Sequence, residues 1–144
     1  MKILLLVLWI AIAAVHCDQV LQPKNSDDIL DHLEGNNYNI YILFFAAASP
    51  AEELSRLTNA EIEKGINTLL TDNPELFYAK IDHTNPNFRK LVEVSGVRNA
   101  PSVFMMVHGQ GVWVSEGTSA LIIDRIRDFL PSFKQAASHH EKPY

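Results

Sequence analysis

Two kinds of hydrophobic pattern alternate along the chain. Short apolar runs rich in β-branched and aromatic residues predict strands, and apolar residues repeated every three or four positions predict helices. The expected strands are 19–21, 39–46, 76–82, 103–107 and 112–115, and the expected helices are 26–35, 50–70, 85–95 and 119–135. This order, βαβαβαββα, predicts an α/β fold with a central mixed sheet flanked by helices.

The boundaries and faces of these elements follow from particular residues. Ser26 is expected to cap the first helix, and Thr118 or Ser119 the last. Gly65 is expected to weaken or bend its helix by about 1 kcal/mol relative to alanine. The run 39–46 is apolar on both alternations, which indicates a central strand covered on both faces. The two long helices are expected to bury Leu54, Leu57, Ile62, Ile66, Leu69 and Leu70, and Leu121, Ile122, Ile126, Phe129 and Leu130.

A proline precedes the apolar strand 103–107. Pro101 cannot donate to a strand ladder, so it is expected at the first residue of the strand or in a bend that leads into it. The sequence Gly109-Gln-Gly111 then signals a tight turn into the last strand.

These residues carry a resemblance. The run Gly96-Val-Arg-Asn-Ala-Pro-Ser, followed by Gly109 and Gly117, is similar without a gap to the C-terminal half of the thioredoxin family. In that family the proline is cis and faces the redox site, so the resemblance implies a cis Ala100–Pro101 bond. Together with the element order, the resemblance covers about residues 19–135.

The redox position departs from the family pattern. In thioredoxins, a strand that ends in an aromatic pair and alanine leads into Cys-x-x-Cys at the start of a helix. Here 44–46 is Phe-Phe-Ala, and the two cysteine positions hold Ser49 and Glu52, or Ala48 and Ala51 after a shift of one residue. Thiol–disulfide exchange needs a thiolate, so no such activity, and no enzyme activity, is expected.

A second departure lies in the strand before that position. The family often places a buried acid there, which helps to move protons during exchange, and this sequence has Leu43. The chain therefore resembles redox-inactive members such as the non-catalytic domains of protein disulfide isomerases. The resemblance implies that an extended protein or peptide segment lies against a proline loop lined by Ala48, Ser49, Pro50, Asn99, Ala100 and Pro101.

Charge and composition narrow the remaining chemistry. The net charge of −5, with scattered Lys and Arg, argues against nucleic acid as a partner. His83 and His108 lack the spaced partners of a metal site, so no metal and no cofactor are expected. Trp113 is expected to pack in the sheet, with an exposed anchor as the alternative.

The chain ends differ from the rest. Residues 1–17 have a lysine followed by an apolar run from Ile3 to Val15, which resembles a signal peptide removed after Cys17. We therefore expect a thioredoxin-like domain at 18–135, a disordered tail at 136–144, and no membrane span after cleavage. The expected location is the secretory pathway, in the endoplasmic reticulum lumen or outside the cell.

Three functions remain open on these grounds. The first is a non-catalytic, chaperone-like module that binds protein or peptide. The second is an accessory subunit of a membrane-bound complex, held by an uncleaved N-terminal helix. The third is a thiol–disulfide oxidoreductase that uses Cys17, the single cysteine, or a partner's thiol.

The mass of the mature protein separates the first two functions. Because 1–17 carries the signal-peptide pattern, we expect intact-mass spectrometry of the native protein to give a chain that begins near Asp18. A mass that includes Met1 and the apolar run would contradict cleavage and favour the anchored subunit.

Overall fold

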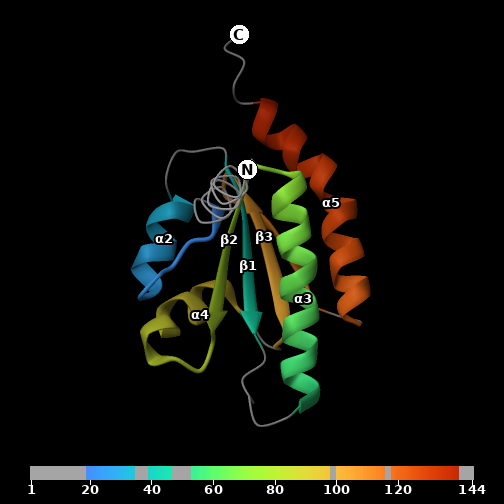
Figure 1. Cartoon of the computed structure of the whole chain (residues 1–144). Helices are drawn as coiled ribbons and strands as arrows, with labels where there is room; N and C mark the ends of the chain where they lie inside the picture. Colours follow the sequence, from blue (N-terminus) through green and yellow to red (C-terminus); the bar gives the residue numbers. More distant parts are fainter. Residues whose placement is uncertain (1–18, 35–38, 47–52, 98–99, 116–117, 140–144) are drawn as a thin grey trace, which may run out of the picture.

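The structure is a computed structural model that describes residues 19–34, 39–46, 53–97, 100–115 and 118–139. Its elements are α2 (Ser26–Glu34), β1 (Ile40–Ala46), α3 (Glu53–Asp72), β2 (Leu76–Asp82), the 3₁₀ helix η1 (Pro86–Phe88), α4 (Arg89–Ser95), β3 (Ser102–Val107), β4 (Gln110–Val114) and α5 (Ser119–His139). Strands and helices form one sheet with helices on both faces (Figure 1).

The sheet is mixed, as predicted. Its strand order is β2-β1-β3-β4, with β1 parallel to β2 and antiparallel to β3, and β3 antiparallel to β4. The prediction of a strand at 19–21 is wrong. This segment makes only one parallel bridge, from Val20 to Tyr78, and one hydrogen bond, 2.7 Å long, that Leu21 N donates to Tyr78 O. Pro23, which has no N–H for a ladder, follows two residues later.

The central strand joins two hydrophobic cores. All seven residues of β1 are buried, which confirms the prediction of a strand covered on both faces. Ile40, Ile42 and Phe44 face the core under α3 and α5, and Leu43 and Phe45 face the core under α2 and α4. Figure 1 shows these two helix pairs on opposite sides of the sheet.

Gln19 anchors the beginning of the described chain. Its buried Nε2 lies within hydrogen-bond distance of three carbonyl oxygens, those of Leu70 (3.0 Å), Asn73 (2.9 Å) and Leu76 (3.2 Å). An amide nitrogen carries two hydrogens, so the three carbonyls share them. The contact holds the segment before α2 against the connection between α3 and β2.

Ser26 does not cap α2, contrary to the prediction. Asn25 Oδ1 accepts the N–H of Asp28 at 3.1 Å and takes the capping role instead. Ser26 is buried, and its Oγ donates to Asn87 O (3.1 Å) and accepts from Leu91 N (3.0 Å). This hydroxyl therefore ties α2 to the beginning of α4, a pairing that the local sequence of α2 does not reveal.

The hydrophobic stripes of the long helices were predicted too wide. Ile62, Ile66, Leu69 and Leu70 of α3 and Ile122, Ile126 and Leu130 of α5 are buried, as predicted. Leu57, Leu121 and Phe129 are 56%, 47% and 36% exposed, so their predicted burial is wrong, and the side chain of Leu54 lies outside the described set. Each helix packs on the sheet with one flank, and periodicity alone does not show how far around the helix that flank extends.

Pro131 lies inside α5 and does not end it, because the helix continues to His139. The predicted tail at 136–144 therefore begins too early, and 140–144 lie outside the described residues. Pro131 is exposed, so the carbonyl of Arg127 that loses its helical partner can bond to water. Thr118 accepts the N–H of Leu121 at 3.3 Å, which confirms one of the two predicted caps.

The hairpin turn begins one residue before the predicted Gly109-Gln-Gly111 signal. His108 (φ 46°) and Gly109 (φ 78°) form a two-residue turn with positive φ, the type that suits strand twist. Gly111 belongs to β4 instead. A Cβ there would lie 2.2 Å from Cζ of Phe104, so this glycine makes room for the aromatic ring.

Gly65 also has a packing role. A Cβ there would lie 2.5 Å from Cγ1 and 2.6 Å from Cδ1 of Ile123, which is buried between α3 and α5. The sequence suggested only a local cost to the helix, whereas the structure shows that the absent side chain lets α5 approach α3.

Gly65→Ala should therefore destabilise the protein. Alanine favours the helix by about 1 kcal/mol, but overpacking a buried contact costs about 1–3 kcal/mol. We expect a net loss of up to about 2 kcal/mol in the free energy of unfolding, measured in urea. The double variant Gly65→Ala/Ile123→Ala should lose less than the sum of the single variants, because the clash is gone. A single Gly65→Ala variant more stable than the native chain would contradict the proposed close packing.

Candidate functional site

The proline loop lies at the end of the central strand. Phe45 pairs with Ser102, the residue after Pro101, and the Ala100–Pro101 peptide bond is cis. Ala100 and Pro101 are half-buried. The other predicted groove residues, Ala48, Ser49, Pro50 and Asn99, lie outside the described residues, so the groove itself stays a prediction.

Polar groups at the same edge are bound to neighbours. Ala46 pairs with Asp82, and His83 Nδ1 lies 3.2 Å from the Ala46 carbonyl oxygen. Because a carbonyl only accepts, this contact places a proton on Nδ1. Asp82 Oδ1 accepts from Thr84 Oγ1 (2.6 Å) and Thr84 N (3.0 Å). Hydrogen bonds from the Thr84 hydroxyl and backbone hold the pKa of Asp82 below its ordinary value.

The contacts of Asp82, His83 and Thr84 stabilise a turn and do not form a reactive centre. Asp82 and Thr84 are exposed, and the histidine ring serves the backbone of β1. Among the described residues, no group of three or more histidine, cysteine or carboxylate side chains gathers as a metal site. The same residues contain no helix long and apolar enough to cross a bilayer.

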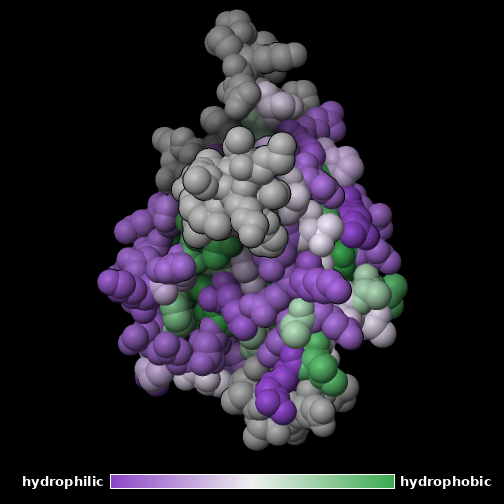
Figure 2. All heavy atoms as spheres, in the orientation of Figure 1, coloured by the Kyte–Doolittle hydropathy of each residue, from purple (hydrophilic) through white to green (hydrophobic). Residues whose placement is uncertain are grey.

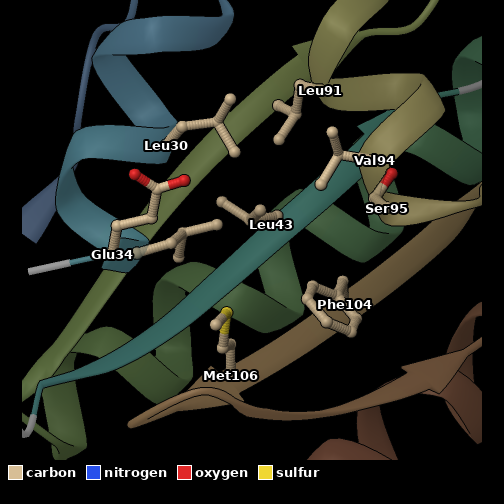
Figure 3. Close-up of a pocket in the computed structure, with 9 residues that line it drawn as sticks. Leu30, Glu34, Leu43, Leu91, Val94, Ser95, Phe104 and Met106 are labelled. Carbon is tan, nitrogen blue, oxygen red and sulfur yellow. The ribbon is translucent and has the colours of Figure 1, made fainter.

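A hydrophobic cavity lies farther along the sheet, between α2 and α4 (Figure 3). It has a volume of about 260 Å³. Its floor is formed by Leu43 of β1 with Phe104 and Met106 of β3. Its walls come from the two helices and consist of Leu30, Leu33, Glu34, Leu91, Val94 and Ser95.

The side chains in the cavity come from both helices. Leu30 and Leu91 approach each other from α2 and α4 above Leu43 (Figure 3). The hydrogen bonds of Ser26 to Asn87 and Leu91 hold these two helices together beside the cavity. Val94 is 67% exposed although it lines the cavity, so part of the wall is open to solvent.

Two polar residues stand among the lining residues. Glu34 contributes a carboxylate from the end of α2, and Ser95 contributes a hydroxyl from the end of α4 (Figure 3). Ser95 Oγ donates to Val92 O at 3.2 Å, so its lone pairs remain to accept a bond. A ligand that fits would thus be apolar in its body and carry a hydrogen-bond donor or a positive charge at its edge.

Leu43 belongs to the cavity floor and also occupies the position where the resemblance to thioredoxins implies a buried acid. It pairs with Phe104 in the sheet and is 1% exposed. The resemblance places the family's buried acid at this residue, and an uncompensated carboxyl in such apolar surroundings would be costly. Leucine instead makes the cavity floor apolar. Sequence reasoning identified the substitution at Leu43 but missed the cavity, because its lining is brought together from four separate elements.

Trp113 packs as predicted for a sheet residue. Its ring centroid lies 5.4 Å from that of Phe45 and 4.8 Å from that of Phe104. The side chain is half-buried. It therefore extends the aromatic surface of the α2 and α4 face toward the edge of the sheet.

Solved structures of thioredoxins share this fold. The chain is similar to thioredoxin O2 from Arabidopsis thaliana (TM-score 0.62, 13% identity, 76% of this chain and 93% of that chain). It is also similar to thioredoxins from Nicotiana alata (0.60, 17%, 76% and 91%) and Trypanosoma brucei brucei (0.59, 15%, 78% and 91%). No protein-family model and no curated protein matches the sequence. The fold is thus thioredoxin-like, and the single cysteine leaves no Cys-x-x-Cys motif.

Thr84→Val tests the turn beside the proline loop. Loss of the hydroxyl donor should raise the pKa of Asp82 toward its ordinary value, measured by NMR titration of the carboxyl carbon. A carboxyl whose pKa is lower in the folded than in the unfolded protein stabilises the fold at pH values above the unfolded pKa, and this stabilisation is lost as the pH falls through the folded pKa. In Thr84→Val, the free energy of unfolding should therefore depend less on pH in this acid range.

Thr71→Val is the matched control, because its hydroxyl donates to a carbonyl, Asn67 O, and not to a carboxylate. An Asp82 pKa that is the same in the native protein and in Thr84→Val would contradict the geometry of this turn.

Proposed function

We propose that this protein is a non-catalytic binding module of the secretory pathway that holds extended polypeptide through an apolar side chain. The observation that carries the proposal is the cavity over Leu43. A thioredoxin-like fold without the two thiols keeps its surfaces but cannot exchange disulfides. Binding is then the activity that remains for the face around the former redox position.

The size of the cavity supports a side chain as ligand. Pockets for drug-sized molecules hold about 300–1,000 Å³, whereas an apolar cavity of about 150 Å³ accepts benzene. A cavity of about 260 Å³ lies between these limits and suits one large side chain, such as phenylalanine, leucine or methionine. Burying such a side chain contributes about 1.5–3 kcal/mol, which predicts that a peptide binds this single site weakly and reversibly.

The acidic charge around the cavity favours a peptide that has a basic residue next to the inserted apolar side chain. Asp27, Asp28, Asp31 and Glu34 make α2 acidic, and the whole chain carries a net charge of −5. Lys90 pairs with Asp27 at 3.1 Å, and Glu34 is the acidic residue among those that line the cavity. A lysine or arginine beside the inserted side chain would meet this carboxylate.

The proline loop supplies the second half of the proposed site. Pro101 precedes Phe104 by three residues, so an extended segment of three or four residues spans the distance of about 10 Å. In the proposal, backbone binds at the loop lined by Ala48, Ser49, Pro50, Asn99, Ala100 and Pro101, and one side chain enters the cavity. The non-catalytic domains of protein disulfide isomerases offer the functional comparison.

A pair of short peptides tests the cavity. The probe has one phenylalanine between two lysines in a glycine and serine chain, and its partner has serine in place of phenylalanine. Fluorescence polarisation of labelled peptide with the native protein should show at least tenfold tighter binding of the phenylalanine peptide. Glu34→Gln should weaken its binding and reduce the salt dependence.

Val94→Asn should weaken binding of the phenylalanine peptide about three- to tenfold, because it replaces an apolar side chain of the cavity wall without adding charge. Leu57→Asn is the matched control, since Leu57 is also an exposed apolar residue, lies on α3 and does not line the cavity. Equal affinity for both peptides, or equal losses in Val94→Asn and Leu57→Asn, would contradict the proposed site.

A further inference from the structure

One edge of the sheet lacks the usual protection against strand addition. β4 is the last strand in the order β2-β1-β3-β4, and within the described residues no segment pairs with its outer side. Proteins commonly protect such edges with charges, prolines or bulges. The five residues Gln110–Val114 contain no charge and no proline, and they pair with β3 without a bulge.

The register of the hairpin shows which backbone groups face outward. Val107 and Gln110 close a two-residue turn, so they exchange both hydrogen bonds. Hydrogen-bonded and non-hydrogen-bonded pairs alternate in an antiparallel ladder. Gly111 and Trp113 therefore belong to the non-hydrogen-bonded pairs with β3, and their N–H and C=O groups point away from the sheet.

We propose that two copies of this chain associate through β4, antiparallel to each other, with Val112 of one copy opposite Val112 of the other. This register pairs Gly111 of one copy with Trp113 of the other, so the outward donors and acceptors meet in two pairs. The two four-stranded sheets then form one continuous sheet of eight strands. The association goes beyond the binding function proposed above and does not depend on it.

The side chains of β4 are complementary in this register. Gly111 has no side chain, and the ring of its own Phe104 lies over it. The large Trp113 of the second copy therefore comes opposite a position without a side chain and beside an aromatic ring. Aromatic neighbours across strands stabilise a sheet, and a bulky residue at 111 would crowd this place. No like charges oppose each other along the strand.

A second, separate feature lies on the same side of the molecule. α5 packs over β3 and β4, whereas α3 packs over β2, and Ile123 of α5 faces Gly65 of α3. Leu121 and Phe129 lie about 120–160° around α5 from Ile123, on the flank away from α3. This flank faces the β4 edge, and both side chains are partly exposed. Figure 2 shows hydrophobic atoms at the surface beside the lower part of α5.

The two features belong to one interface. A two-fold axis through Val112 brings the exposed flanks of both α5 helices toward each other above the joined strands. Strands lie about 4.8 Å apart, which separates the helix axes by roughly 10–14 Å, and helices in contact lie about 8–10 Å apart. Large side chains such as Leu121 and Phe129 bridge that difference, so their exposure in the single chain has a physical reason.

Charge exchange at Val112 tests the association. Sedimentation velocity of the native protein at about 50 µM should give twice the mass of the chain. Val112→Lys and Val112→Glu should each sediment as monomers, because like charges then lie opposite each other across the axis. An equimolar mixture of the two variants should recover the dimer, a result that misfolding of either variant would not produce.

Variants of α5 give an independent measurement. Leu121→Glu/Phe129→Glu should weaken the dimer at least tenfold, whereas Leu57→Glu, an exposed leucine on α3, should leave it unchanged. A native protein that is monomeric at 50 µM would overturn the proposal and leave the edge to an extended strand from another protein. A dimer that survives both charge substitutions, or that Leu57→Glu disrupts equally, would also overturn it.

Discussion

The two-sided burial of β1 is the constraint on which the rest of the structure depends. A strand with apolar residues on both faces is stable only between two hydrophobic layers, so the chain must supply helices to both sides. α3 and α5 complete one layer with a tight contact at Gly65, where α5 approaches α3 closely. α2 and α4 complete the other, but they meet less fully, and the cavity over Leu43 lies between them. Space for a ligand thus appears where the second layer is incomplete.

Much of the fold was predictable because it follows from local patterns. Apolar runs and helix punctuation gave the element order, the mixed sheet and the central position of 39–46. The errors arose where a distant partner decides the outcome. Ser26 looks like a helix cap in its own segment but bonds to Asn87 and Leu91 instead. The stretch 19–21 has strand-like residues but forms a single bridge.

The candidate site was predictable only in part. The missing cysteines and Leu43 follow from the sequence once the resemblance to thioredoxins is recognised, because they are losses at known positions. The cavity could not be foreseen, since its wall and floor come from α2, α4, β1 and β3 and depend on how closely the helices pack. Glycines show the same limit. Gly65 is expected from its local sequence to weaken a helix, and Gly111 to belong to a turn, but both make room for side chains from elsewhere in the chain, those of Ile123 and Phe104.

We propose that a thioredoxin-like fold without its thiols binds an apolar side chain over Leu43. Intermolecular nuclear Overhauser effects test it most directly, measured between the ring protons of a bound phenylalanine peptide and the methyl groups of the native protein. We expect contacts from the ring to the methyl groups of Leu30, Leu43 and Leu91. Contacts confined to methyl groups on the α3 and α5 face, such as those of Ile66 and Ile126, would contradict it.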